Sequence, residues 1–395
     1  MHNIMAHESL SGVTIQDVAA QAGVSAMTVS RVINHPARVA PATRQRVEQA
    51  IHDLGFVPNA LARSLLHGRT HTIALIVSDI SNPFFTLIAR GVEDVAQRNG
   101  YTVLFGNSDE SPEKERQYLQ AMLSRRIDGM LISATGSASR PMLELLQRHK
   151  CPFVLLDRAI DGISADTVTG DSAGGARVLT EHLIGLGHRR VALVKGPPWA
   201  STAQDRRRGY LDALLAHGIP PHPELIVEGN FKRDGGYRAA QQLLALPPEQ
   251  RPTAIFADNN FHSIGVLEAL REAQLRVPQD IAMVCFDDIE LASAIYPFLT
   301  VVAQPARTFG TIAMQFLLER LDGSATEPPR RVVLPPELLV RISCGAPAAP
   351  PIPLPSQGGD GVPDAPRPSM GEGWGVRGND SKGASLPSPR RGRQA

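Results

Sequence analysis

The chain has 395 residues, of which 43% are hydrophobic and 20% are charged, and this ordinary composition excludes wholesale disorder. Its 40 Lys and Arg against 39 Asp and Glu give a formal net charge of +1, so charge alone indicates no nucleic-acid partner. The length fits two or three domains, and no apolar run approaches the ~20 residues of a membrane-spanning helix.

The cellular compartment is indicated by cysteine usage and by the first residues. Cys151, Cys285 and Cys344 are far apart and have neither disulfide-framework nor zinc-ligand spacing, which favours a reducing compartment. The opening MHNIMAHESL lacks the apolar run of a signal peptide, and Met1 or Met5 could be the start. We expect a cytoplasmic protein with no membrane partner.

Residues 14–34 predict two short helices joined by a turn. Thr14 and Asp17 have the spacing of a capping box, Gly23 supplies the turn, and Ser25 can cap the second helix. Apolar residues at i, i+3 and i+4 give each helix one inward face. The pattern is that of a helix-turn-helix, whose second helix is free to enter a major groove.

A third helix and a short linking segment follow. Pro41 opens the third helix, which is expected to stop at Gly55. Asn59 can cap a helix through Leu65 that is too short to be stable alone, so we expect it to be ordered only when a partner holds it. The predicted boundaries are a DNA-binding domain at 12–57 and a hinge helix and linker at 58–70.

Residues 71–344 alternate between strand and helix patterns. The predicted strands in the first set are 73–77, 101–105, 129–132 and 153–156, with helices within 84–95, 117–123 and 143–146. The second set has helices at 182–186, 209–215, 237–244 and 264–273, and strands at 191–194, 225–227, 254–256 and 281–286. A helix at 310–321 and strands near Val332 and Leu339 complete the two lobes. Such repetition predicts parallel sheets flanked by helices.

Residues 345–395 have a different composition. Proline and glycine dominate and apolar periodicity is absent, so we expect a disordered tail. Its basic run 389–393 could touch DNA or an acidic partner, although an incidental solvated extension is favoured.

Several motifs in one order resemble the LacI/GalR family of bacterial repressors over roughly residues 14–343. These motifs are VSAMTVSRVIN, VPNALARSLL, SDISNPFF, LGH, CFDD and LTVVAQP. The resemblance implies an α/β fold with an N-terminal all-α helix-turn-helix head and a two-lobed, periplasmic-binding-protein-like core of parallel sheets flanked by helices.

The resemblance also implies which residues contact DNA. Arg31 can pair with guanine O6 and N7, Ala26 and Met27 can make apolar contacts with a thymine methyl, and the hydroxyl and amide side chains suit phosphates. Leu65 matches a leucine that wedges into a base step from the minor groove, although packing against the core is the alternative. Ala40 departs from the family's hydroxyl at the third-helix cap. The DNA-binding set is Thr14, Ser25, Ala26, Met27, Thr28, Ser30, Arg31, Asn34, Asn59, Ala62 and Leu65.

The family places its effector between the lobes, at the carboxyl ends of the strands. Amides, carboxylates and arginines over aromatic rings suit a polyhydroxylated ligand, so a sugar or sugar acid is expected, and Arg158 and Arg206 leave room for a carboxylate or phosphate. Asn259-Asn260 stands where relatives often have Asn-Asp. The effector-binding set is Asn82, Phe84, Phe85, Asp157, Arg158, Arg206, Phe231, Asn259, Asp287 and Gln304.

The expected function is that of a sequence-specific transcription repressor, a homodimer released from a pseudo-palindromic operator by a small sugar-like effector. The alternative is a sugar-binding receptor of the periplasmic-binding-protein type without a transcriptional role. An enzyme ranks third, because no nucleotide-binding loop or nucleophile motif is present, and no cofactor is expected. His182 and His188 do not form a credible metal-ligand set. The tail has no leucine heptads, which favours a dimer over a tetramer.

Overall fold

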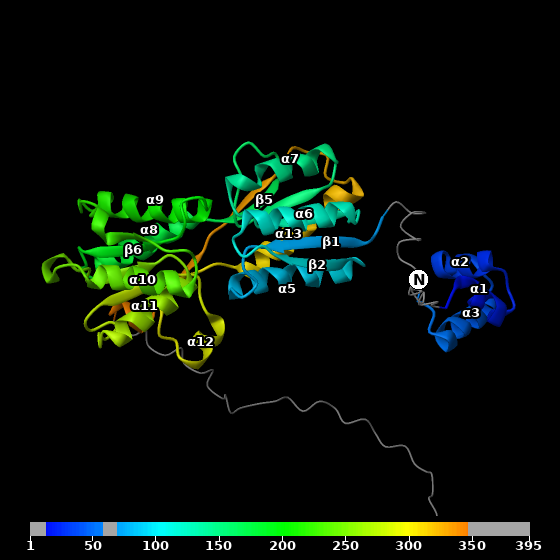
Figure 1. Ribbon diagram of the computed structural model, residues 1–395, viewed down its shortest axis with the longest axis horizontal. Helices are drawn as coiled ribbons and strands as arrows, with labels where there is room; N and C mark the ends of the chain where they lie inside the picture. The colour runs from blue at the N-terminus through cyan, green and yellow to red at the C-terminus, as the bar shows by residue number, and fades with distance from the viewer. Residues whose placement is uncertain (1–12, 58–68, 347–395) are drawn as a thin grey trace, which may run out of the picture. The chain divides into compact units, whose positions relative to one another are not determined.

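The computed structural model describes residues 13–57 and 69–346 (Figure 1). The hinge residues Asn59, Ala62 and Leu65 and the tail from residue 347 lie outside these ranges, so the expectations for them, and for the domain boundaries beside them, stay predictions. None of the helices within the described ranges is long and apolar enough to cross a membrane.

The predicted head helices are confirmed. They are α1 (Ile15–Ala22), α2 (Ala26–Asn34) and α3 (Pro41–Leu54), with a 3-10 turn η1 (Pro36–Arg38) between the last two. Thr14 closes a capping box with Asp17, and Gly23 ends α1 with a left-handed φ of 65°. Buried side chains from all three helices, Val18, Val29 and Val47 among them, form one small core.

The first lobe contains a six-stranded parallel sheet in the order β11-β5-β4-β3-β1-β2. Its strands are β1 (Thr72–Val77), β2 (Thr102–Asn107), β3 (Gly129–Ile132), β4 (Phe153–Leu156), β5 (Asp166–Gly170) and β11 (Arg331–Leu334). One face packs on α5 (Pro83–Arg98) and α13 (Ala306–Asp322), and the other on α6 (Pro112–Ser124) and α7 (Arg140–Arg148). Successive residues of β1 alternate between the two resulting cores, as a strand buried on both faces requires.

The second lobe contains a six-stranded sheet in the order β12-β10-β9-β8-β6-β7, in which only β12 is antiparallel to its neighbour. Its strands are β6 (Val191–Lys195), β7 (Ile226–Glu228), β8 (Ala254–Ala257), β9 (Ala282–Phe286), β10 (Thr300–Ala303) and β12 (Glu337–Leu339). Its helices are α8 (Ser172–Gly185), α9 (Ser201–Ala216), α10 (Arg233–Leu244), α11 (Asn260–Glu272) and the short α12 (Glu290–Ile295).

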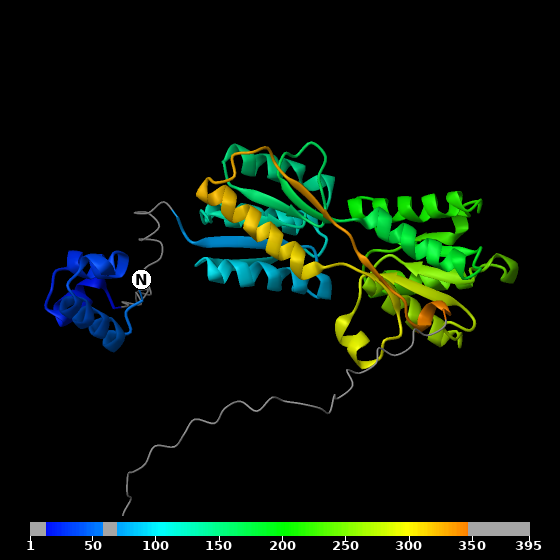
Figure 2. The same cartoon turned by 180° about the vertical axis from the view of Figure 1, so that it is seen from behind.

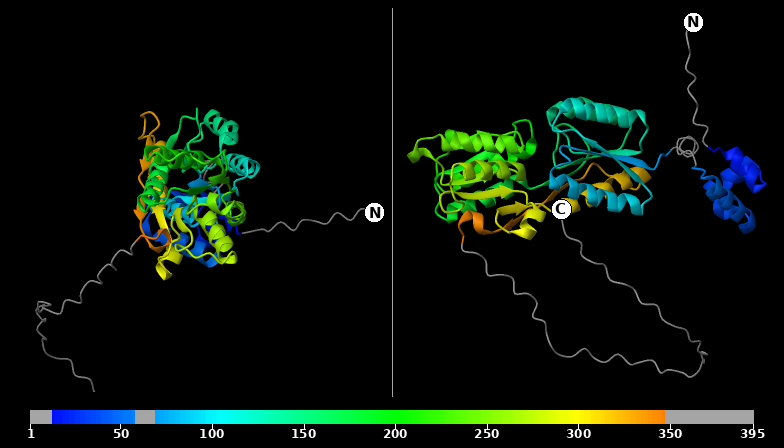
Figure 3. Two further views of the ribbon diagram at one scale, coloured as in Figure 1. Left: turned by 90° about the vertical axis from the view of Figure 1, so that its left-hand side faces the viewer. Right: turned by 60° about the horizontal axis from the view of Figure 1, so that its bottom comes forward.

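The chain crosses between the lobes three times: from β5 to α8, from β10 to α13 and from β11 to β12 (Figures 2 and 3). The sequence predicted α13, β11 and β12 as a helix and two strands near the end of the core. It did not predict that α13 and β11 pack in the first lobe. β5, β10 and α12 were missed. β5 reads DTVTG, which has no continuous apolar run, and it is a strand because β4 and β11 flank it.

Candidate effector cleft and DNA-binding surface

One cleft between the lobes gathers the sequence-predicted effector residues. All of that set except Gln304 line it, together with three residues that the sequence did not indicate, Asp79, Glu110 and Thr202. Gln304 lies directly behind the lining, where its Nε2 donates to Asp287 Oδ1 at 2.8 Å. The space open to the centre of a water molecule is only about 30 Å³, enough for one or two waters, so a larger ligand requires the lining to move.

Asp157 marks the end of β4 in the first lobe. Its φ of 64° is unusual for a residue other than glycine, and its backbone N–H donates to the Val168 carbonyl at 2.9 Å. Burial raises the pKa of the Asp157 carboxyl to about 6, against the opposing effect of Arg158 and Arg206. The carboxylate therefore faces the cleft as an acceptor that titrates close to neutral pH.

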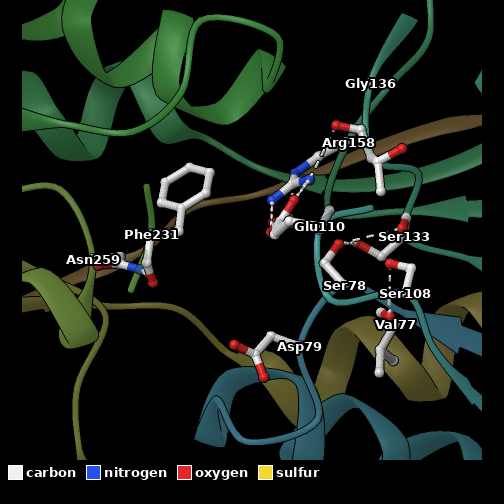
Figure 4. A network of polar contacts seen from close by, with 12 residues as sticks. Val77, Ser78, Asp79, Ser108, Glu110, Ser133, Gly136, Arg158, Phe231 and Asn259 are labelled. Carbon is white, nitrogen blue, oxygen red and sulfur yellow. Dashed lines mark hydrogen bonds and ion pairs between the residues drawn. The ribbon is translucent and has the colours of Figure 1, made fainter. Parts of the chain in front are cut away.

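Arg158 is held by an ion pair with Glu110. Its Nη1 and Nη2 each donate to one Glu110 carboxylate oxygen at 2.7 Å, and Nη1 also reaches the Ala134 and Thr135 carbonyls at 3.3 Å. Figure 4 shows this pair on the first lobe with Phe231 of the second lobe opposite it. Glu110 is the third residue after β2, whereas Asp157 directly follows β4, and the place of Glu110 in the loop NSDES at a strand end is the signal that could have indicated it.

Asp287 is the counterpart of Asp157 in the second lobe. It follows β9 with a φ of 70°, its N–H donates to the Val302 carbonyl at 2.9 Å, and burial raises its pKa. Arg206, on α9, brings Nη2 to 3.7 Å from Asp287 Oδ2 and donates from Nη1 to the Asp258 carbonyl. The Arg206 guanidinium lies 3.8 Å from the centre of the Phe286 ring, a close cation–π contact.

The cleft-lining Phe231 is fixed from behind by a fully buried Asp–His pair. Asp258 Oδ1 lies 3.0 Å from His262 Nδ1, and His262 Nε2 accepts the Phe231 N–H at 3.0 Å. Asn259 donates from Nδ2 to the Phe231 carbonyl at 3.0 Å and accepts the His262 N–H at 2.8 Å. Phe231 thereby keeps a left-handed φ of 60°. Both polar ends of the Asn259 side chain are bonded within the chain.

Direct contacts join the two lobes across the cleft. Asn260 Nδ2 donates to Asn82 Oδ1 at 2.9 Å, and Lys232 forms an ion pair with Asp79. The Arg158 guanidinium lies 5.5 Å from the centre of the Phe231 ring. Asn260 thus uses its side-chain amide to bond the opposite lobe.

Unpartnered polar atoms concentrate around this cleft. Within residues 13–57 and 69–346, five buried side-chain N or O atoms have no hydrogen-bond partner: Arg158 Nε, Thr169 Oγ1, Arg206 Nε, Asn260 Oδ1 and Gln304 Oε1. All but Thr169 Oγ1 belong to residues that line the cleft or bond its lining. Each unmet group costs about 1–3 kcal/mol, and two of them, the Nε atoms of Arg158 and Arg206, belong to residues that line the cleft, where a polar ligand can satisfy them.

The aromatic lining differs in how freely its members can contact a ligand. Phe84 and Phe85 follow the Asn82 cap of α5, with ring centres 5.2 Å apart in an edge-to-face contact. Phe84 also packs edge-on against Phe309 of α13. Phe84 is therefore partly committed to the core of the first lobe.

On the head, two predicted base-contacting side chains share an exposed face. Met27 is 71% exposed and Arg31, four residues later on α2, is exposed too, whereas Ala26 is half-buried against the head core. Hydroxyl and amide groups bond locally: Ser25 Oγ accepts from the Thr28 N–H at 3.2 Å, Asn34 donates to Ser30 at 3.3 Å, and Thr14 bonds Asp17.

The two histidines considered for metal binding lie in separate environments. His182 Nε2 is 3.2 Å from Cys344 Sγ, and His188 Nδ1 is 2.9 Å from Thr253 Oγ1. In the part of the chain that the structure describes, no group of three or more His, Cys, Asp or Glu side chains is placed to hold a metal ion.

A helix-turn-helix head joined to a two-lobed core with a polar cleft defines a DNA-binding regulator of the ligand-responsive class. Residues 14–59 match the model of bacterial regulatory proteins of the lacI family, and residues 180–344 match a periplasmic binding protein-like domain. The chain is 36% identical over 332 residues to the HTH-type transcriptional repressor PurR of Aliivibrio fischeri, covering 84% of this chain and 98% of that protein. It is 37% identical over 329 residues to the ribose operon repressor of Escherichia coli K12, covering 83% and 98%.

Solved structures agree with these matches. The lac repressor dimer bound to operator and the anti-inducer ONPF has a TM-score of 0.74 at 28% identity, covering 85% of this chain and 99% of that one. A LacI family regulator from Enterococcus faecium with bound ribose has a TM-score of 0.62 at 30% identity, covering 69% and 98%. The chain belongs to the LacI family of transcriptional repressors, and nothing supports the alternative of a receptor without a transcriptional role.

Proposed function

We propose that the effector of this repressor is a small sugar of pentose size, with ribose as the first candidate, bound in the interlobe cleft. The observation that carries the proposal is the group of unpartnered buried donors and acceptors around that cleft. A sugar hydroxyl both donates and accepts, so it can meet the Nε atoms of Arg158 and Arg206 and the carboxylates of Asp157 and Asp287. The aromatic rings of Phe84, Phe85 and Phe231 line the cleft and can contact the C–H groups of the sugar.

The size of the cleft supports a monosaccharide over a larger ligand. Only about 30 Å³ is open in this structure, and the lobes already touch through Asn260–Asn82 and Lys232–Asp79. A pentose requires the least separation of these contacts. Both ribose-related matches named above support the same choice.

We propose further that the chain acts in the cytoplasm as a homodimer on a pseudo-palindromic operator, with Arg31 reading a guanine and Leu65 entering the minor groove. Effector binding would shift the lobes so that the two hinge segments no longer order together on DNA. This mechanism requires the effector to bind the DNA-free state more tightly than the DNA-bound state.

The experiment that tests the operator proposal is DNA binding upstream of the protein's own and adjacent genes, titrated in salt with and without sugars. We expect specific binding that ribose weakens, and a loss of about 10- to 100-fold for Arg31→Ala. The control is Arg125→Ala, which also removes one positive charge but from an exposed position in the two-lobed region, away from the helix-turn-helix head. If Leu65→Ala binds the operator as tightly as wild type, Leu65 does not enter the minor groove as proposed. If no specific DNA binding is seen at any salt concentration, the proposal that the chain binds an operator is wrong.

The effector proposal is tested by calorimetric titration of the full chain with ribose, xylose, glucose, galactose and cellobiose. We expect saturable one-site binding of a pentose and weaker binding of the disaccharide. Tighter binding of cellobiose than of every monosaccharide would contradict the size argument.

A further inference from the structure

We propose that Glu110 makes the cleft select a neutral sugar over the corresponding sugar acid. The inference rests on the proposed function, because it concerns the same cleft, and it names the charge class of the ligand. Glu110 lines the cleft beside Arg158, the cation that an anionic ligand would otherwise contact (Figure 4).

Glu110 occupies both terminal nitrogens of Arg158. The two hydrogen bonds, each 2.7 Å, form the bidentate pairing in which a guanidinium binds a carboxylate most favourably. The side chains of Arg158 and Glu110 are only 3% and 10% exposed, so water screens the pair weakly. Arg158 therefore has two N–H groups outside these bonds, the second one on Nη2 and the one on Nε, which lies 3.6 Å from Asp157 Oδ2, and its charge is already paired.

The backbone holds Glu110 in this place. The residue has a left-handed φ of 60°, which a glutamate seldom adopts, and its N–H donates to the Ser78 carbonyl at 3.0 Å. The neighbouring Asp109 also has a positive φ and is tied to Lys114 by an ion pair with an Nζ to Oδ2 distance of 2.6 Å. Glu110 is thus built into the wall of the cleft and is not a mobile surface carboxylate.

The remaining charges of the lining make an anion unfavourable. The lining carries two guanidiniums against four carboxylates, which are Asp79, Glu110, Asp157 and Asp287. Lys232 neutralises Asp79, and Asp287 lies beside Arg206. A sugar acid would add a negative charge to this buried cleft, in which both guanidiniums of the lining are already paired with carboxylates. The ligand carboxylate would be repelled by the lining carboxylates, and this repulsion is strong at close range in a buried site. Removing the Glu110 charge would free Arg158 to bind a carboxylate.

The test compares each aldose with its aldonate, which carries one negative charge and is open-chain, so the change in their affinity ratio between wild type and Glu110→Gln reports the effect of the Glu110 charge. Calorimetric titrations of the full chain use ribose and ribonate, xylose and xylonate, and glucose and gluconate, with wild type and Glu110→Gln. We expect wild type to prefer each aldose, and Glu110→Gln to reduce the ratio of aldonate Kd to aldose Kd by at least about tenfold. Glu110→Asp, which retains the charge, should keep the wild-type preference.

Two controls separate selectivity from folding and from general charge effects. Glu113→Gln removes an exposed carboxylate that pairs with Arg116 three residues later, and it should leave the ratio unchanged. Thermal unfolding with and without aldose reports whether each variant is folded and still binds. Aldose binding with an unchanged ratio in Glu110→Gln, or a wild-type preference for the aldonate, overturns the inference alone. Failure of wild type to bind any aldose overturns the proposed function and the inference with it.

Discussion

The two lobes end their central strands in the same way but pair the resulting carboxylates differently. Asp157 after β4 and Asp287 after β9 both have positive φ values, and both donate their N–H to the next strand. In the first lobe the cation is the adjacent Arg158, which Glu110 already occupies. In the second lobe it is Arg206, from a helix, stacked on an aromatic ring.

The comparison teaches which part of the site the fold dictates. In both lobes the carboxyl ends of the parallel strands face the cleft. The residue that directly follows such a strand therefore lies at the cleft, so the fold topology determines the position of each carboxylate. The residues that pair with the two carboxylates come from different elements in the two lobes. They determine how many carboxylate oxygens can still accept a hydrogen bond from a ligand. Asp287 already accepts a hydrogen bond from Gln304, whereas no hydrogen bond from another described residue reaches the Asp157 carboxylate, which has Arg158 Nε 3.6 Å away.

The largest expected effect is an unequal loss of sugar affinity in Asp157→Asn and Asp287→Asn. Asparagine tolerates the left-handed backbone, so each change removes charge and acceptor capacity with little strain. Hydrogen bonds to charged groups contribute about 1.5–3 kcal/mol each, so we expect about 100-fold weaker ribose binding for Asp157→Asn and about tenfold for Asp287→Asn. Calorimetry on both variants measures the difference, and equal losses would refute the argument from available acceptors.

A smaller effect is expected from the buried Asp258–His262 pair, which fixes the backbone of Phe231 in the second lobe. His262→Leu leaves the Phe231 N–H and one Asp258 oxygen without a partner, so we expect about tenfold weaker sugar binding and a loss of about 1–3 kcal/mol in unfolding free energy.

The matched variant His262→Gln tests whether His262 acts by positioning Phe231. A glutamine oxygen can accept the Phe231 N–H, so we expect sugar affinity to recover more than stability does. Urea unfolding and calorimetry measure the two separately. Unchanged affinity in His262→Leu would show that Phe231 does not depend on this support.

Much of this arrangement could be predicted from the sequence, because motif order and strand-end position carry the information. The carboxylates after apolar runs, such as Asp157 in LLDR and Asp287 in CFDD, followed from the strand pattern together with the family resemblance, which places the effector at the strand ends. Glu110 was missed because the predicted strand 101–105 ends two residues before β2 does, which left Glu110 far from the expected strand end. His262 was missed because a lone histidine on a helix shows no sign of its partners, which come from the end of β8 and from Phe231.

The tertiary pairings were beyond the sequence for a physical reason. The Asn260–Asn82 and Lys232–Asp79 contacts join residues more than 150 positions apart, and nothing local distinguishes them from exposed polar groups. The return of α13 to the first lobe is similar, since an apolar stripe in the sequence predicts a buried helix face but not which of two sheets covers it.

A pH dependence of sugar affinity, of a few-fold to about tenfold, should come from Asp157. The native pKa of Asp157 is raised to about 6, so the native state binds more protons than the unfolded state between about pH 4 and 6. The contribution of Asp157 to the free energy of unfolding therefore increases as pH falls from 7. Sugar affinity decreases over the same range, because the carboxylate that accepts a hydrogen bond from the sugar becomes protonated. Asp166, whose pKa is lowered to about 2 with Arg320 and Arg330 beside it, stays ionised in this window.

The difference between wild type and Asp157→Asn isolates this titration from the histidines. Calorimetry and thermal unfolding from pH 5 to 8 should show wild-type affinity falling and wild-type stability rising toward pH 5, with both trends reduced in the variant. Parallel loss of affinity in wild type and variant would assign the pH dependence to another group.

The smallest expected effect is at the contact that holds the lobes together. Lys232 pairs with Asp79 of the opposite lobe, but its side chain is 35% exposed, and such pairs contribute about 0–1 kcal/mol. Lys232→Met should weaken ribose binding by no more than about fivefold, speed association, and remove part of the salt dependence of affinity. Arg233→Met breaks the adjacent ion pair with Glu268 within the second lobe and should leave all three unchanged. Stopped-flow binding at low and high salt measures them, and an identical response of the two variants would mean that the Lys232–Asp79 pair does not hold the lobes closed.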